Sequence, residues 1–156
     1  MNVVEKTATA ENELAPAQRD DLRVVAAMMI PASTEYKVPG ADDQLIQADI
    51  LATLGRDAMG VREALDHIAG LAGGPLAALD AVKREAVITE FRATGGVAAA
   101  TLSRVILQCY DRDDRVLRSL GLELRPPFPN GHTLEQGDWA LLDPVKMRPS
   151  MWRRAP

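Results

Sequence analysis

Apolar residues recur at helical spacing in five stretches between residues 16 and 111. Positions i, i+3, i+4 and i+7 lie on one face of an α-helix, so this spacing predicts helices that bury one face. The apolar positions of the five stretches are Leu22, Val25, Ala26 and Met29; Leu45, Ile46, Ile50 and Leu54; Val61, Leu65, Ile68 and Ala72; Leu79, Val82, Ala86, Val87 and Phe91; and Ala98, Leu102, Val105, Ile106 and Cys109.

Prolines, acidic residues and glycines predict where these helices begin and end. The first should start near Pro16, since a proline in the first turn loses no hydrogen bond, and should stop at Pro31. The second should start at Ala41, the third should end at residues 73–75, and the fourth should run from about Leu76 to Arg92.

The fifth stripe cannot continue past Cys109, because the same frame would bury Asp113. An unpaired buried carboxylate costs several kcal/mol. We therefore predict a break near Arg112 and a short last helix with Asp113 as its N-cap. This helix should bury Val116, Leu117 and Leu120 and close at Gly121.

Residues 122–156 have a different character, with six prolines in 35 residues and no helical or alternating pattern. The segment is nevertheless more apolar than a solvated tail requires. It should pack either on its own bundle or on a partner. Its apolar residues are Phe128, Leu134, Trp139, Leu141, Leu142, Val145, Met147 and Trp152.

The predicted fold is therefore all-α, a small bundle of about five to six helices with a long irregular C-terminal arm. Residues 1–14 should be a flexible N-terminal arm, 15–121 the helical domain, and 122–156 an extended proline-rich arm. Aromatic residues make up only 4% of the chain, which suits helix packing better than sheets.

The net charge of −4 makes general nucleic-acid binding a poor expectation, because an acidic surface repels phosphates. The charge is uneven: residues 144–156 hold four basic residues and no acidic one. No apolar run approaches the roughly 20 residues that span a bilayer. Residues 1–15 resemble neither a signal peptide nor a twin-arginine signal, so we expect a cytoplasmic protein, with export by a partner left open.

No catalytic pattern stands out. The two histidines, His67 and His132, lack ligand partners at i+3 or i+4, and no serine lies in a G-x-S-x-G turn. The glycines at 70, 73 and 74 follow a helix rather than a strand, which is the wrong context for a dinucleotide. Cys109, on an apolar stripe, should be an unreactive buried thiol. We therefore expect no catalytic, cofactor-binding or metal-binding residues, and no enzyme activity of the chain alone.

Several short motifs together resemble the gluconate 2-dehydrogenase subunit 3 family. They extend from about Leu14 to Arg153, and their order and spacing make chance agreement improbable. In chain order they are Leu22, Met29-Ile30-Pro31-Ala32, Pro39-Gly40-Ala41, Tyr110-Asp111-Arg112-Asp113-Asp114-Arg115-Val116-Leu117, Leu120-Gly121, Arg125-Pro126-Pro127-Phe128-Pro129, Gly131, Gly137-Asp138-Trp139, Leu141-Leu142-Asp143-Pro144-Val145, Arg148 and Trp152-Arg153.

The resemblance implies a helical, non-catalytic small subunit of a flavin-dependent dehydrogenase of the glucose–methanol–choline type. The large subunit of such a complex binds FAD and oxidises a hydroxyl of a sugar, sugar acid or glycoside, and the small subunit supports its folding, stability or export. An alternative from the residues alone is a free-standing helical adaptor or regulator with a basic C-terminal tail. Candidate partner-binding residues are Tyr110, Pro126, Pro127, Phe128, Trp139, Leu141, Leu142, Trp152 and Arg153.

Overall fold

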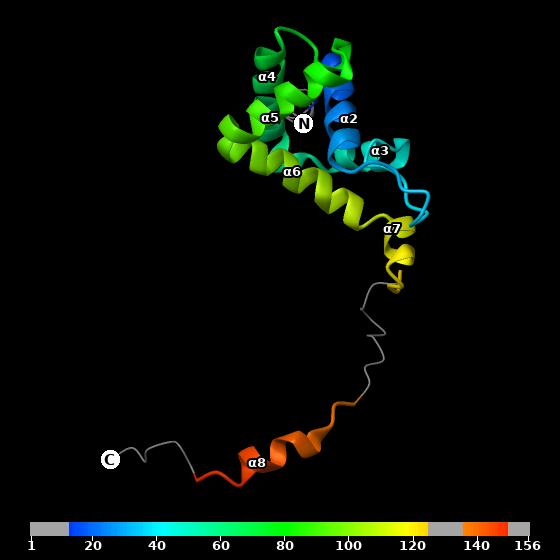
Figure 1. The fold of residues 1–156 in the computed structure, drawn as a ribbon, viewed down its shortest axis with the longest axis vertical. Helices are drawn as coiled ribbons and strands as arrows, with labels where there is room; N and C mark the ends of the chain where they lie inside the picture. Colours follow the sequence, from blue (N-terminus) through cyan, green and yellow to red (C-terminus); the bar gives the residue numbers. More distant parts are fainter. Residues whose placement is uncertain (1–12, 125–135, 150–156) are drawn as a thin grey trace, which may run out of the picture. The chain divides into compact units, whose positions relative to one another are not determined.

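The computed structural model describes residues 13–124 and 136–149, which belong to two separate units of the chain. In the first unit, six α-helices form the body (Figure 1): α2 (Pro16–Met29), α3 (Gln44–Thr53), α4 (Ala58–Ala72), α5 (Ala81–Thr94), α6 (Gly96–Asp111) and α7 (Asp114–Ser119). Two 3-10 turns, η1 (Gly55–Asp57) and η2 (Leu76–Ala78), precede α4 and α5. The fold is all-α, as predicted.

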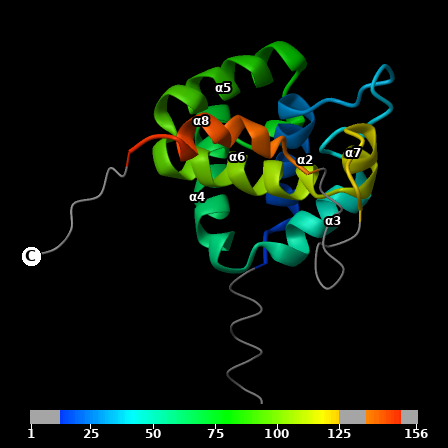
Figure 2. The same cartoon turned by 90° about the horizontal axis from the view of Figure 1, so that it is seen from below.

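Helix α4 is the central element of the body, packing against α2, α5 and α6, while α3 packs on α6 (Figures 1 and 2). The buried faces are those that helical spacing predicts for α2, α4 and α6. The largest fully buried side chains are Leu22, Ile46, Ile50, Val61, Leu65, Ile68, Leu76, Leu102 and Ile106. Together they make one hydrophobic core without aromatic residues at its centre.

Acidic N-caps fix where three helices start. Asp43, Asp80 and Asp113 accept backbone hydrogen bonds from Leu45, Lys83 and Arg115 at 2.9–3.0 Å. The break at Arg112 and the capping of α7 by Asp113 confirm the prediction made from the charged run. Gly121 follows α7 in the left-handed region, with φ of 70°.

Two predicted helix starts were wrong, and several residues that we predicted to face the core are exposed as a result. Helix α3 starts at Gln44, three residues late, and turns Ile46 and Ile50 inward, so Leu45 is exposed. Leu76, the predicted first residue of the fourth helix, lies in η2 instead, and Asp80 caps α5, which starts at Ala81. With this start, Ile88 and Phe91 face the core. The other predicted core residues that are exposed are Val82, Ala86 and, beyond the last full turn of α7, Leu120.

The N-terminal boundary of the body lies slightly earlier than predicted. Leu14, assigned to the flexible arm, is buried. Its carbonyl accepts a hydrogen bond from the Arg19 guanidinium at 2.9 Å, and the Glu13 carbonyl accepts one from Arg62 at 3.2 Å. These contacts tie residues 13 and 14 to α2 and α4.

In the described part of the second unit, residues 139–146 are helical where the sequence pattern predicted irregular chain. Residues Trp139–Leu142 form the 3-10 turn η3, and Asp143–Lys146 form the short helix α8. Asp138 caps η3 by accepting from the Ala140 N–H at 3.0 Å, and Pro144 occupies the first turn of α8. Local capping therefore supplies the helical turns that hydrophobic spacing alone did not indicate.

Candidate partner interface

Two of the motifs that carry the family resemblance meet in space. The loop between α2 and α3 contains Pro39-Gly40-Ala41, and the junction of α6 and α7 contains Tyr110 to Arg115. The Tyr110 hydroxyl donates a hydrogen bond to the Pro39 carbonyl at 3.2 Å. At Gly40 an added Cβ would lie 2.9 Å from the backbone nitrogen of Ala32, so only glycine lets the loop pass this closely.

Arg115 joins the two motifs through two carboxylates. Its guanidinium donates to both oxygens of Asp43, at 2.7 and 3.0 Å, and to both oxygens of Asp113, at 2.9 Å. These hydrogen bonds lower the pKa of both aspartates and raise that of Arg115. Because each aspartate also caps a helix, one arginine links the start of α3 to the start of α7. We call Asp43, Asp113 and Arg115 the corner triad.

A second arginine ties α6 to α3. Arg112 Nε donates to Asp49 Oδ2 at 2.6 Å, and its Nη2 donates to Thr53 Oγ1 at 2.9 Å. The same nitrogen lies 3.4 Å from the sulfur of Cys109. Burial raises the pKa of the Cys109 thiol, so it is protonated at neutral pH and a poor nucleophile. The geometry supports a structural thiol, as predicted.

These contacts give the motif residues a structural explanation. Tyr110 was a candidate partner-binding residue, yet its side chain lies in the core at 9% exposure. A ring this buried has little surface to offer a partner, because its hydroxyl donates to the Pro39 carbonyl and its ring packs in the hydrophobic core. Tyr110 therefore holds the loop before α3 in place.

The remaining described candidates lie on one short segment. Trp139, Leu141 and Leu142 are 65%, 74% and 42% exposed, and Val145 and Met147 beside them are also exposed. Polar groups of the segment bond within it: Lys146 pairs with Asp143 at 3.0 Å, and the Trp139 Nε1–H donates to Gln136 at 3.4 Å. We call Trp139, Leu141, Leu142, Val145 and Met147 the apolar segment. Pro126, Pro127, Phe128, Trp152 and Arg153 lie outside the described residues.

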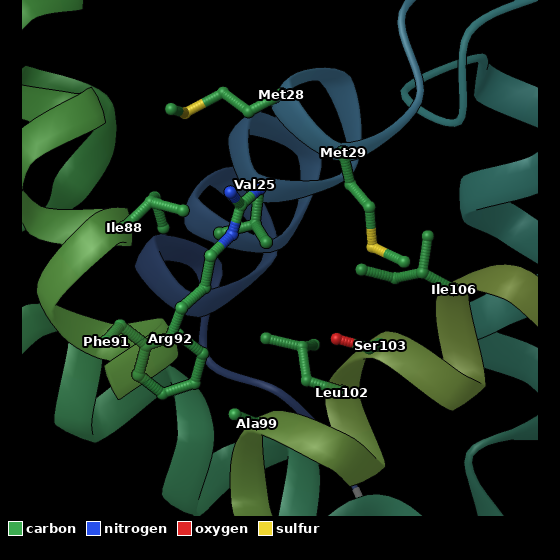
Figure 3. A pocket seen from close by; sticks show the side chains of 10 residues that line it. All are labelled: Val25, Met28, Met29, Ile88, Phe91, Arg92, Ala99, Leu102, Ser103 and Ile106. Carbon is green, nitrogen blue, oxygen red and sulfur yellow. The ribbon is translucent and has the colours of Figure 1, made fainter. Parts of the chain in front are cut away.

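The helical body carries an apolar pocket of about 220 Å³ between α2, α5 and α6 (Figure 3). Val25, Ile88 and Phe91 line it as buried side chains. In Figure 3 the Met29 side chain points towards Ile106 and the Arg92 side chain extends towards Val25. The remaining lining residues are Met28, Ala99, Leu102 and Ser103.

Sequence reasoning missed this pocket because three helices contribute to it. Val25, Phe91, Leu102 and Ile106 were correctly predicted to face inward, but periodicity does not tell a filled interface from a hollow one. Met28 lies off the predicted stripe of α2, and this was the only local signal of a wider apolar face.

No group of three His, Cys, Asp or Glu side chains in residues 13–124 and 136–149 is placed to hold a metal ion. Asp21, the buried carboxylate of α2, accepts a hydrogen bond from the Ala77 N–H at 2.8 Å and so fastens η2 to α2. None of the helices described there is long and apolar enough to cross a membrane.

Comparisons of the chain with family models, with curated proteins and with solved structures give no match. The resemblance to the gluconate 2-dehydrogenase subunit 3 family therefore rests on the motif residues themselves.

Proposed function

We propose that this chain is the non-catalytic small subunit of a flavin-dependent dehydrogenase of the glucose–methanol–choline type. In this proposal the large subunit binds FAD and oxidises a hydroxyl of a sugar, sugar acid or glycoside, and this chain supports its folding and stability. The observation that supports the proposal is the apolar segment, whose five large apolar side chains within residues 139–147 are not buried by the described residues of their own unit.

Exposed apolar residues scattered singly are ordinary, but a contiguous group of them marks an interaction surface. The segment contains a tryptophan, which is among the residues that contribute most to binding energy because its rigid ring buries much area. Charged groups are confined to Asp138, Asp143, Lys146 and Arg148, and two of them pair with each other. An apolar surface with a polar rim has the composition of a protein–protein interface.

The contacts between the α2–α3 loop and the junction of α6 and α7 support the same proposal in a different way. The corner triad and the Tyr110–Pro39 contact set the position of α7, the last helix before residue 125. The residues that carry the resemblance to the family are then those that hold α7 against the start of α3, a structural role that fits a binding subunit without a reaction centre.

Purification of the native complex tests the proposal. The chain, tagged at its N-terminus and produced at its natural level, should bring down one large flavoprotein that mass spectrometry identifies, with flavin absorbance in the complex. Trp139→Ala should reduce recovery of the flavoprotein, whereas Tyr36→Ala, which removes an exposed ring of the α2–α3 loop, should not. Recovery that is unchanged by Trp139→Ala but lost at raised salt would favour a basic adaptor tail instead.

We place the complex in the cytoplasm as part of this proposal. A free buried thiol at Cys109 is compatible with a reducing compartment. Fractionation of cells that produce the tagged chain tests this, since recovery of the complex outside the cytoplasmic fraction would contradict it.

A further inference from the structure

The pocket between α2, α5 and α6 combines an apolar lining with one cation. Nine of its ten lining residues are uncharged, and Arg92 is the tenth. Among the described residues Arg92 has no hydrogen bond or ion pair, and its side chain extends across the pocket towards Val25 (Figure 3). Arg104, Arg112, Arg115 and Arg118 pair with carboxylates, whereas Arg92, like Arg23 and Arg56, does not within the described chain, and of these three only Arg92 lines the pocket.

The size of the pocket limits what it can hold. Sites for cofactors and drug-sized ligands measure roughly 300–1,000 Å³. At about 220 Å³ this pocket is too small for a flavin or a nicotinamide nucleotide. It is suited to one large apolar side chain, and an apolar pocket filled by a single partner side chain is the usual arrangement at the centre of an interface.

The lining can adjust to such a side chain. Met28 and Met29 are half-buried, and Met29 points into the pocket towards Ile106 (Figure 3). Methionine is unbranched and polarizable, so it adapts to the shape of an apolar partner. The floor is rigid by comparison, because Leu102 and Ile106 are fully buried.

We propose that this pocket receives one apolar side chain of the large subunit and that a carboxylate next to this side chain in the partner pairs with Arg92. The inference rests on the proposed function, since it names the feature of the large subunit that the body recognises. A planar guanidinium binds a carboxylate through two parallel hydrogen bonds. The pair with Arg92 would therefore favour an apolar side chain that has a carboxylate beside it over one that has none.

The test uses the full chain and the large flavoprotein subunit recovered with it. Arg92→Glu places a negative charge at the pocket and should weaken association by about tenfold, the effect of losing a hydrogen bond between charged groups. Arg56→Glu is the matched control, because Arg56 is an exposed arginine that does not line the pocket. Equal weakening by both variants would show a general charge effect and overturn the proposal.

Ser103→Met fills the pocket from the α6 side and should also weaken association by about tenfold, with its folding checked by thermal melting. A measurement without substitutions accompanies it. In the full chain carrying methyl-labelled methionine, the signals of Met28 and Met29 should shift when the large subunit binds, while the exposed Met59 of α4 serves as the reference.

The outcomes separate the two proposals. Normal association of Arg92→Glu, with unshifted Met28 and Met29 signals in the complex, overturns the pocket assignment and leaves the small-subunit role intact. No association of the unaltered chain with any flavoprotein overturns both. If the Met28 and Met29 signals of the isolated chain change with its own concentration, a second copy fills the pocket and the assignment is wrong.

Discussion

Substitution of Asp43 separates two contributions that one carboxylate makes to the fold. Its Oδ1 caps α3 by accepting from the Leu45 N–H at 3.0 Å, and both its oxygens bind Arg115. Asparagine is as good an N-cap as aspartate but carries no charge, whereas alanine can neither cap nor pair. Asp43→Asn therefore removes the ion pair alone, and Asp43→Ala removes the pair and the cap.

The magnitudes follow from exposure and geometry. The side chains of Asp43 and Arg115 are 27% and 35% exposed, so solvent screens their attraction, yet the pairing is bidentate. We expect about 1 kcal/mol, the upper end for surface pairs, from Asp43→Asn. Loss of the cap adds about 1 kcal/mol in Asp43→Ala. For a domain of this size each kcal/mol lowers Tm by about 4 °C, so the losses should be about 4 °C and about 8 °C.

Thermal unfolding followed by circular dichroism at neutral pH measures both variants beside the unaltered chain. Equal Tm values for the two variants would show that the cap contributes nothing. A Tm for Asp43→Asn that matches the unaltered chain would remove the corner triad from the account of stability.

The effect should also depend on pH. Hydrogen bonds from Arg115 lower the pKa of Asp43 and Asp113 from the ordinary value of 3.8. Their contribution is thus fully present above the unfolded-state pKa and disappears as the pH falls through the lowered folded-state pKa. The Tm difference between Asp43→Asn and the unaltered chain should therefore be constant near neutrality and shrink in strong acid. A difference that grew in acid would contradict this sign.

Four further predictions concern the interface and the chemistry. Trp139→Ala should weaken association with the partner by about 2 kcal/mol, roughly thirtyfold in a binding titration, with little change in the Tm of the isolated chain. Trp152→Ala should weaken association less. A lowered Tm with unchanged association would assign Trp139 to the core. Truncation after Gly121 should keep the helical circular-dichroism signal, because the buried residues of the described chain all lie between Leu14 and Val116. It should weaken partner association severely, and an unfolded product would contradict the first of these expectations. The Cys109 thiol should react with an aromatic disulfide reagent much more slowly in the native chain than in denaturant, since burial raises its pKa, and equal rates would refute this. The isolated chain should be colourless and inactive, so a stoichiometric flavin absorbance in partner-free protein would be incompatible with the proposed role.

Helical spacing predicted the elements whose apolar stripes are long and uninterrupted. The face of α6 from Leu102 to Cys109 and that of α4 from Val61 to Ile68 are buried as predicted, since a helix with one continuous apolar face has one way to pack. In α3 and α5 the acidic caps Asp43 and Asp80 decide the first residue of the helix. Apolar residues lie on more than one side of both helices, and only tertiary packing selects which side is buried.

The candidate interface could be predicted only in part. The apolar composition of residues 122–156 predicted a segment that packs on its own bundle or on a partner, and this choice stays a prediction. The described residues from Trp139 to Met147 are not buried within their own unit. Only one part of the corner triad was predicted, since the charged run indicated that Asp113 caps a helix. Nothing in the sequence indicated an ion pair between Asp43 and Arg115, which lie 72 residues apart. The pocket depends on the distances between three helices, which no local pattern encodes.

The central claim is that this chain supports the folding of a flavoprotein without taking part in its chemistry. Production of the large subunit with and without this chain tests it most directly, with the fraction of soluble large subunit that retains flavin as the readout. The account predicts that this fraction falls strongly when the chain is omitted or carries Trp139→Ala, and that turnover per bound flavin is unchanged in whatever large subunit remains. Equal flavin retention with and without the chain would contradict it.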